Sequence, residues 1–229
     1  MTTTISKISA KKVEKVMPDA SGKPGRDCLL CPRLKAFRDD WRCRETDWFN
    51  APVPSFGPPG ARLLIVGLAP GLKGANRTGR PFTGDYAGDL LYDTLGRFGF
   101  ARGSYQARPD DGLTLTDARI TNAVRCVPPE NKPTPAEIKT CRSFLAASIA
   151  EMANLRAIVT LGRIAHESTI AALDHRRAAA PFGHGASHEI GTLRVLASYH
   201  CSRYNTNTGV LTPAMFRDVF AAARRYLDA

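Results

Sequence analysis

The sequence lacks any apolar run of 18 or more residues, so no segment is long enough to cross a bilayer as a helix. Its start, MTTTISKISAKKVEKV, lacks the apolar core of a secretory signal peptide. We therefore expect a soluble, cytoplasmic protein that does not bind membranes. Internal repeats and low-complexity tracts are also absent. The apolar fraction of 43% is that of an ordinary globular domain rather than a disordered or fibrous chain.

Carboxylates are scarce relative to basic groups. The chain has 21 Asp and Glu residues against 32 Lys and Arg residues, for a net charge of +11. An excess of this kind attracts polyanions, so nucleic acid is the partner that we expect first. A basic enzyme with an unrelated substrate remains the alternative at this point, because net charge says little about chemistry.

The chain alternates between two kinds of apolar pattern. Runs of β-branched and aliphatic residues, each about as long as a buried strand, occupy positions 62–68, 119–124, 156–161 and 193–198. Apolar residues at helical spacing mark helices over 87–98, 138–152 and from 213 onward. This alternation predicts an α/β fold with a mostly parallel sheet covered by helices on both faces, and functional loops at the carboxyl ends of the strands.

Two helix starts carry capping signals. Thr134, Pro135 and Glu137 form a capping box with a favoured proline, and Thr212 and Pro213 open the last helix in the same way. Residues 1–20 are polar and unpatterned, which indicates a flexible tail. The remaining residues, 21–229, suffice for one sizeable core, so we expect a single domain there.

Four of the six cysteines have an arrangement that suggests a shared site. Cys28 and Cys31 form a C-x2-C pair, Cys126 ends the second predicted strand, and Cys141 lies in the first turns of a capped helix. In a cytoplasmic chain such residues are metal ligands or free thiols more often than disulfides. Spacing alone leaves three readings open: zinc, an iron–sulfur cluster, or buried cysteines without a ligand.

The segment GLAPGLKGANRTGRPFTGD, residues 67–85, follows the first strand and is rich in glycine. Gly74 and Gly79 have the spacing of a phosphate-binding Walker A loop. Arg80 and Pro81, however, replace the Lys and Ser/Thr that such a loop requires, and G-x-G-x-x-G is absent. We therefore expect the bare backbone to admit a flat ligand close to the main chain rather than a nucleoside triphosphate.

Side chains beside this loop suit the recognition of a base. Phe82 offers an aromatic face, although a core aromatic is the simpler reading of that residue taken alone. Asn122, at the end of the second strand, offers both a hydrogen-bond donor and an acceptor. Asparagine is depleted in strand interiors, so its placement there favours a functional role.

A second loop, SYHCSRYNTNTG, follows the fourth strand and contains the candidate catalyst His200. Ser202 and Asn205 follow closely, so several hydrogen-bonding groups reach one place. A single histidine is usually structural. A histidine at the carboxyl end of a strand, facing a glycine loop, is nevertheless a candidate for catalysis. Arg203 and Tyr204 at the tip can reach a duplex, although a solvated loop tip carries the same residues.

These motifs together resemble the uracil-DNA glycosylase superfamily, and most closely its iron–sulfur family 5. The matching segments are GLAPG at 67–71, GANRTGRPFTGD at 74–85, TNAVRC at 121–126 and H-x-S-x-x-N at 200–205. The resemblance implies a three-layer α/β/α sandwich with a central four-stranded parallel sheet. It also implies a 4Fe–4S cluster on Cys28, Cys31, Cys126 and Cys141.

The resemblance further implies a monomeric DNA repair enzyme that flips uracil out of double-stranded DNA. Hydrolysis of the N-glycosidic bond then leaves an abasic site, and hypoxanthine and xanthine are further expected substrates. By the same resemblance Phe82 stacks on the base, Asn122 binds its edge and His200 binds its carbonyl. The candidate substrate-binding residues are Gly67, Ala69, Phe82, Asn122, Ser202 and Asn205.

One departure from the wider superfamily concerns the attacking water. Other families carry Asp, Asn or Glu within the first motif, where this chain has Leu68 and Ala69. Asp85 is the remaining candidate, although it also has the position of a cap for the helix that begins near Tyr86. Two alternatives therefore stay open: a DNA-binding relative without catalysis, and a relative that couples covalently to DNA.

Overall fold

The computed structural model describes residues 22–229, so the predicted tail, residues 1–20, lies outside the described residues. The helices are α1 (Pro32–Arg44), α2 (Ala75–Thr78), α3 (Tyr86–Arg97), α4 (Pro135–Ala150), α5 (Arg163–Ala172), α6 (Arg203–Asn207) and α7 (Pro213–Asp228). The strands are β1 (Leu63–Gly67), β2 (Ala101–Arg102), β3 (Thr114–Leu115), β4 (Ala118–Asn122), β5 (Ala157–Leu161), β6 (Ser187–Ile190) and β7 (Leu193–Ser198).

The four predicted strands form the parallel part of one sheet, in the order β4-β1-β5-β7. Gly67, the last residue of β1, is in register with Asn122, the last residue of β4. Leu161 of β5 is in register with Ser198 of β7. All four carboxyl ends therefore meet at one edge of the sheet. The glycine loop (residues 67–85) and the histidine loop (residues 198–209) both begin there.

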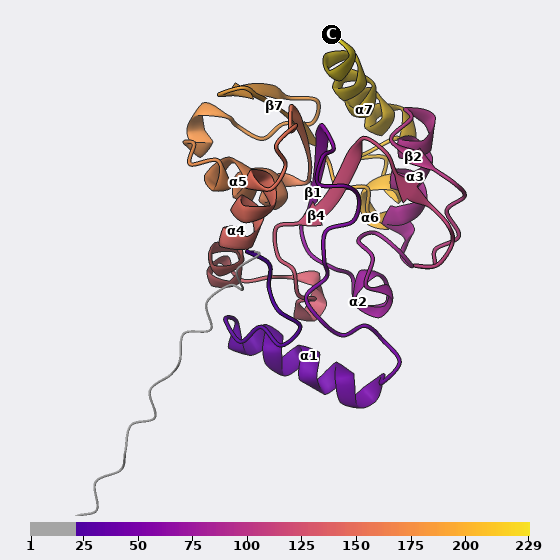
Figure 1. Ribbon diagram of the computed structural model, residues 1–229, viewed down its shortest axis with the longest axis vertical. Coiled ribbons are helices and arrows are strands. Elements are labelled where there is room, and N and C mark those ends of the chain that lie inside the picture. The colour runs from indigo at the N-terminus through magenta and orange to yellow at the C-terminus, as the bar shows by residue number, and fades with distance from the viewer. Residues whose placement is uncertain (1–21) are drawn as a thin grey trace, which may run out of the picture.

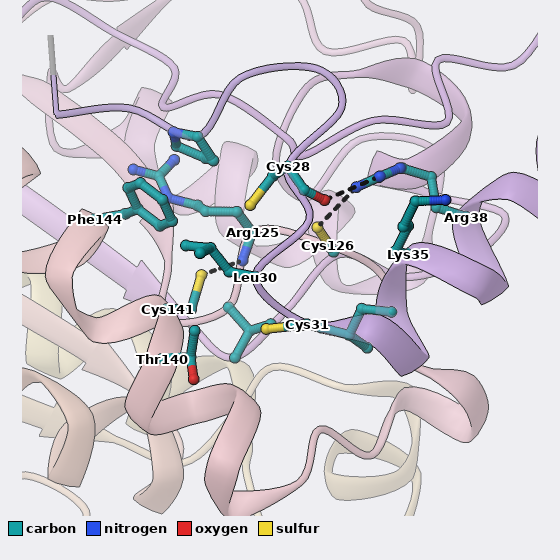
Figure 2. A pocket seen from close by; sticks show the side chains of 13 residues that line it. Cys28, Leu30, Cys31, Lys35, Arg38, Arg125, Cys126, Thr140, Cys141 and Phe144 are labelled. Atoms are coloured by element: carbon teal, nitrogen blue, oxygen red, sulfur yellow. Dashed lines mark hydrogen bonds between the residues drawn. The ribbon is translucent and has the colours of Figure 1, made fainter. Parts of the chain in front are cut away.

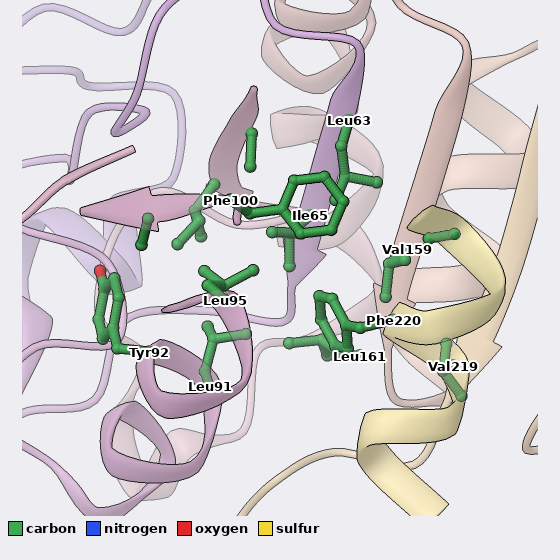
Figure 3. Packing of buried hydrophobic residues seen from close by; sticks show 14 of the residues in the cluster. Leu63, Ile65, Leu91, Tyr92, Leu95, Phe100, Val159, Leu161, Val219 and Phe220 are labelled. Carbon is green, nitrogen blue, oxygen red and sulfur yellow. The ribbon is translucent and has the colours of Figure 1, made fainter. Parts of the chain in front are cut away.

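Alternating residues of the strands supply two separate cores, one on each face of the sheet. Leu63 and Ile65 of β1 pack with α3 and α7, as Figure 3 shows. Leu64 and Val66 pack on the other face with residues of α4 and α5. Figure 1 shows these helix pairs on opposite sides of the strands. The predicted α/β fold, with helices covering both faces of the sheet, is confirmed.

The sheet also has a fifth strand that the sequence pattern did not reveal. β6 pairs antiparallel with β7 at the edge of the sheet. Its residues, SHEI, are mostly polar and partly exposed, so they lack the apolar signal of a buried strand. The two-residue strands β2 and β3 form a separate antiparallel pair for which the sequence likewise gave no signal.

Helix α1 lies outside the three layers, beyond one end of the sheet (Figure 1). Its Leu34 packs with Val124 and Phe144 in a third, smaller cluster that includes Cys126 and Cys141. Within residues 22–229, none of the helices combines the length and the apolar character needed to cross a bilayer.

Candidate active site and cysteine pocket

The glycine loop brings Phe82 and Asn122 together at the end of β1. A Cβ atom on Gly67 would lie 2.5 Å from Asn122 Oδ1 and 2.6 Å from Cζ of Phe82, so only glycine leaves both side chains in place. Asn122 is buried, and within the described residues its Oδ1 accepts no hydrogen bond. A buried, unpartnered amide oxygen is costly unless a ligand satisfies it.

Phe82 has a strained backbone that its neighbours hold in place. Its φ of 53° is in the left-handed region, which a bulky aromatic residue seldom adopts. The Tyr105 hydroxyl donates to the Phe82 carbonyl at 3.1 Å and accepts from the Gly84 N–H at 3.3 Å. Tyr92 donates to the carbonyl of Pro81 at 2.7 Å. These three bonds hold the backbone that carries the phenyl ring.

The histidine loop places His200 against this ring. The Phe82 and His200 rings are stacked, with centroids 5.9 Å apart and planes inclined by 28°. The structure thus brings the two predicted loops together from strands far apart in the sequence. Burial lowers the pKa of His200 to about 4, so its imidazole is neutral at physiological pH. A neutral imidazole still carries one N–H that can donate to a ligand.

Ser202 and Asn205 build the loop that carries His200. The Ser202 hydroxyl accepts from the Asn205 N–H at 3.4 Å and thereby caps α6. The side-chain amide of Asn205 donates to the His200 carbonyl at 2.8 Å. These contacts within the loop fix the position of His200. Direct binding of substrate by Ser202 and Asn205 stays a prediction.

Asp85 lies against the glycine loop with an unpartnered carboxylate oxygen. A Cβ on Gly74 would lie 2.4 Å from Asp85 Oδ2, and one on Gly71 would lie 2.8 Å from it. Asp85 occupies the N-cap position of α3, but its side chain makes no capping hydrogen bond. Burial raises the pKa of this carboxyl, although the nearby amides of Gly88 and Ala87 act in the opposite direction.

The tip of the histidine loop is exposed and carries an aromatic and a cationic side chain. Tyr204 has 74% of its surface exposed. The guanidinium carbon of Arg203 lies 5.3 Å from the centroid of the Tyr86 ring, a cation–π contact. The tip can therefore contact a macromolecule without any rearrangement of the core.

Four cysteines from three segments line one pocket, as Figure 2 shows. Cys28 and Cys31 precede α1, Cys126 lies four residues beyond β4, and Cys141 lies in the second turn of α4. The strand is shorter than predicted, so Cys126 follows it rather than ending it. The cavity between these residues has a volume of about 20 Å³. Ala69 of the first motif packs beside it.

The chemistry of the pocket suits four thiolates bound to a common group. The Arg125 backbone N–H donates to Cys141 Sγ at 3.3 Å, and Arg38 Nη1 donates to Cys126 Sγ at 3.8 Å. Burial, with neighbouring thiols adding to it, raises the pKa of Cys126 to about 12 and that of Cys31 to about 11. These thiols are therefore protonated at neutral pH unless a bound cation displaces the protons.

Two kinds of metal group use four cysteine ligands. Across residues 22–229, no three or more His, Cys, Asp or Glu side chains are arranged to hold a metal ion. A structural zinc ion needs four donors around one point, with each sulfur at about 2.3 Å. In a 4Fe–4S cluster each thiolate binds a different iron, so the sulfurs lie further apart. Four cysteine side chains around one pocket are a donor set that either kind of metal group uses.

Several residues that support the site carried no recognisable signal in the sequence. Arg80 and Asp111 form a buried bidentate ion pair, with both N–O distances at 2.7 Å. The guanidinium of Arg80 also contacts the rings of Tyr92 and Tyr105, which hold the Phe82 segment. The two members of this pair are 31 positions apart in the sequence, and no local pattern links them.

Comparison with known proteins identifies relatives over most of the chain. The sequence profile described as "Uracil DNA glycosylase superfamily" matches residues 54–224. A protein named Type-5 uracil-DNA glycosylase from Thermus thermophilus is 45% identical over 204 residues, which cover 86% of this chain and 93% of the relative.

Two further relatives carry the same name. The protein from Mycobacterium bovis is 42% identical over 207 residues, covering 86% of this chain and 77% of the relative. The protein from Pyrobaculum aerophilum is 38% identical over 201 residues, covering 86% of this chain and 88% of the relative. The family match at residues 54–224 includes both loops together with Cys126 and Cys141.

Proposed function

The chain belongs to the uracil DNA glycosylase superfamily, and on this premise we propose that it is the hydrolase that excises uracil from DNA in base excision repair. The observation that carries this function is the meeting of Phe82, His200 and Asn122 at one edge of the sheet. An aromatic face, a neutral N–H donor and an unsatisfied amide are the groups needed to hold a flipped pyrimidine.

In this proposal, the extruded base stacks on Phe82 beside the main chain of the glycine loop. The amide of Asn122 pairs with the edge of uracil, which presents an N–H beside carbonyl oxygens, and this contact satisfies its orphaned Oδ1. As the bond from C1′ to the base breaks, its electron pair moves onto the base. His200 donates to a base carbonyl, where negative charge develops. The neutral imidazole donates through its one N–H and keeps that proton, so the base leaves as an anion.

Water completes the reaction by adding its oxygen to C1′ on the face opposite the departing base. We assign Asp85 to orient this water and accept its proton. The support is the carboxylate against Gly71 and Gly74, the buried Oδ1 without a partner and the absence of a capping bond. The released base anion takes a proton from solvent. A carboxylate in this role contributes about 10²- to 10⁴-fold to the rate.

We further propose that Cys28, Cys31, Cys126 and Cys141 hold a 4Fe–4S cluster. Such a cluster would join the segment before α1 to β4 and α4, and it serves stability rather than the chemical step. Protein purified without oxygen should be brown, with about four irons and four sulfides per chain. Cys126→Ser should lose this colour and unfold more easily, whereas Cys43→Ser, at an exposed cysteine away from the pocket, should keep it. Stoichiometric zinc without iron would contradict the proposal.

The substrate range is proposed to extend to hypoxanthine and xanthine, which also result from deamination. A panel of duplexes, each with one uracil, hypoxanthine, xanthine or etheno adduct, tests this range under single-turnover conditions. Excision of uracil alone would restrict the enzyme to that base. The contacts to DNA are assigned to Arg203 and Tyr204, whose exposure at the loop tip supports this role.

The same assay separates the remaining alternatives. A relative without catalysis binds the uracil duplex and releases no base. A covalently coupling relative yields a protein–DNA adduct that survives denaturant. We propose that residues 21–229 act as one glycosylase domain and as a monomer in the cytoplasm, on nucleoid DNA. The shared sheet beneath both cores supports the single domain, and gel filtration tests the monomer.

A further inference from the structure

Arg38 is a buried cation that faces the cysteine pocket. Only 2% of its surface is exposed, and it lines the pocket from the middle of α1. Its Nη1 donates to Cys126 Sγ at 3.8 Å and its Nη2 donates to the Cys28 carbonyl at 3.0 Å, as the dashed lines of Figure 2 show. One guanidinium thus contacts two of the three segments that supply the cysteines.

Arg125 is a second buried cation in the lining, and 2% of its surface is exposed. Its backbone N–H donates to Cys141 Sγ at 3.3 Å. Its guanidinium donates to neutral acceptors, namely the Val53 carbonyl and the hydroxyls of Ser55 and Ser148. These contacts hold the group in place without neutralising its charge.

Neither guanidinium has a buried carboxylate to balance it. The carboxylate nearest to Arg38 belongs to Asp39, which lies 3.7 Å from Nε, is partly exposed and is also bound by Lys35. Among the described residues the Arg125 guanidinium donates only to neutral acceptors. The Nε atoms of both arginines are buried and have no hydrogen-bond partner. The pocket lining includes Lys35 as a third cation, and no Asp or Glu.

Two buried guanidinium groups without a buried carboxylate destabilise the fold unless a negatively charged group occupies the pocket. Buried charges are normally paired, and an unpaired one destabilises the fold. Arg119 is also buried, and its Nε likewise lacks a partner, but its Nη2 forms an ion pair with Glu151 at 3.1 Å, whereas the one carboxylate near Arg38 lies 3.7 Å away. A cluster bound by four thiolates supplies a net negative charge at the place where Arg38 and Arg125 lie.

We propose that Arg38 and Arg125 are the counter-charges of the iron–sulfur cluster. They hold it in its pocket and set the ease with which it is reduced. The inference rests on the cluster proposed above. Positive charge and donated hydrogen bonds near the sulfurs favour the more negative, reduced cluster, so these two residues raise its reduction potential. They act through the cysteines and do not take part in base excision.

Arg38→Met tests this role, because it removes the charge and retains an unbranched apolar stem. We expect iron loss to a chelator to be about 10-fold faster or more, as for other residues that support a metal site. The reduction potential of the remaining cluster should shift to lower values. Arg38→Lys keeps the charge and should recover much of both properties. Arg125→Met should likewise lose iron faster and have a lower reduction potential, which gives a second and independent test.

Arg119→Met is the matched control, since it removes a buried but paired guanidinium outside the pocket. It should lower the unfolding temperature and leave iron retention and reduction potential unchanged. If Arg38→Met and Arg125→Met match wild type in both properties, the inference is overturned while the cluster stands. If wild-type protein purified without oxygen contains no iron and sulfide, both the inference and the proposed cluster are overturned.

Discussion

His200 is held neutral and stacked against Phe82 in the absence of substrate, so the donor is in place before the base arrives. Preorganised donors of this kind act mainly on developing charge. The site has no acid in its first motif, so stabilisation of the departing base should carry more of the barrier than activation of water.

His200→Ala should therefore lower the single-turnover rate of uracil excision by roughly 10²-fold or more, the effect of one donor aimed at developing charge. The affinity for DNA should stay nearly unchanged, because phosphate contacts dominate it. His188→Ala is the matched control, since this histidine lies on edge strand β6 and contacts the Pro181 carbonyl. Excision by His200→Ala at the wild-type rate would show that the site is wrongly assigned.

Asp85→Asn separates a role in catalysis from a role as a helix cap. The carboxylate must be ionised to accept a proton, so excision by wild type should rise with pH through the raised pKa of Asp85 and then level off. Asp85→Asn should reduce the rate about 10²-fold or more and abolish this rise.

Thermal unfolding of the same Asp85→Asn preparation gives the second measurement. A carboxyl with a raised pKa binds its proton more tightly in the folded state, so its stabilising contribution is present at low pH and is lost as pH rises through the folded pKa. Asp85→Asn should thus be at least as stable as wild type at neutral pH. Lost stability with retained excision would instead identify Asp85 as a cap.

At the scale of elements, the end of β1 depends on the absence of a side chain at Gly67. Gly67→Ala should reduce excision severely, because the new methyl group overlaps both the Asn122 amide and the Phe82 ring. Gly96→Ala is the matched control, since its Cβ would enter open space near the end of α3. This control should gain about 0.5–1 kcal/mol of stability and keep full activity. Equal activity of both variants would contradict the proposed packing.

The main elements could be predicted because their signals are local. The four parallel strands are rich in aliphatic and β-branched residues, and Thr134 and Thr212 cap α4 and α7 as their motifs indicated. Strand β6 could not be predicted, because a partly exposed edge strand has no apolar run. Its pairing with β7 is determined by tertiary contacts that no local window contains.

The candidate site could be predicted only in part, because some of its contacts are tertiary and leave no local sequence signal. Motifs located Phe82, Asn122 and His200, and the structure stacks Phe82 on His200 and places both Phe82 and Asn122 against Gly67. Spacing alone could not show that Asp85 makes no capping bond, because a capping position and a capping bond have the same sequence signal. Nor could it reveal the buried ion pair of Arg80 with Asp111, which forms across separate loops.

At the scale of the whole molecule, we expect the net charge of +11 to govern encounter with DNA. The logarithm of the affinity for undamaged duplex should fall linearly with the logarithm of salt concentration, with a slope of about −0.9 per contacted phosphate. The unimolecular excision step within the bound complex should depend on salt much less. A duplex affinity that does not change with salt concentration would contradict electrostatic binding.

Release of uracil from a duplex with one deoxyuridine tests the central claim most directly. Wild-type protein in excess over the duplex should release free uracil and leave an abasic site, which alkali converts into a strand break at that position. His200→Ala, bound to the same duplex at saturation, should release it roughly 10²-fold more slowly. A wild-type protein that binds the duplex and leaves the uracil in place, or that remains attached to the DNA in denaturant, would contradict the account.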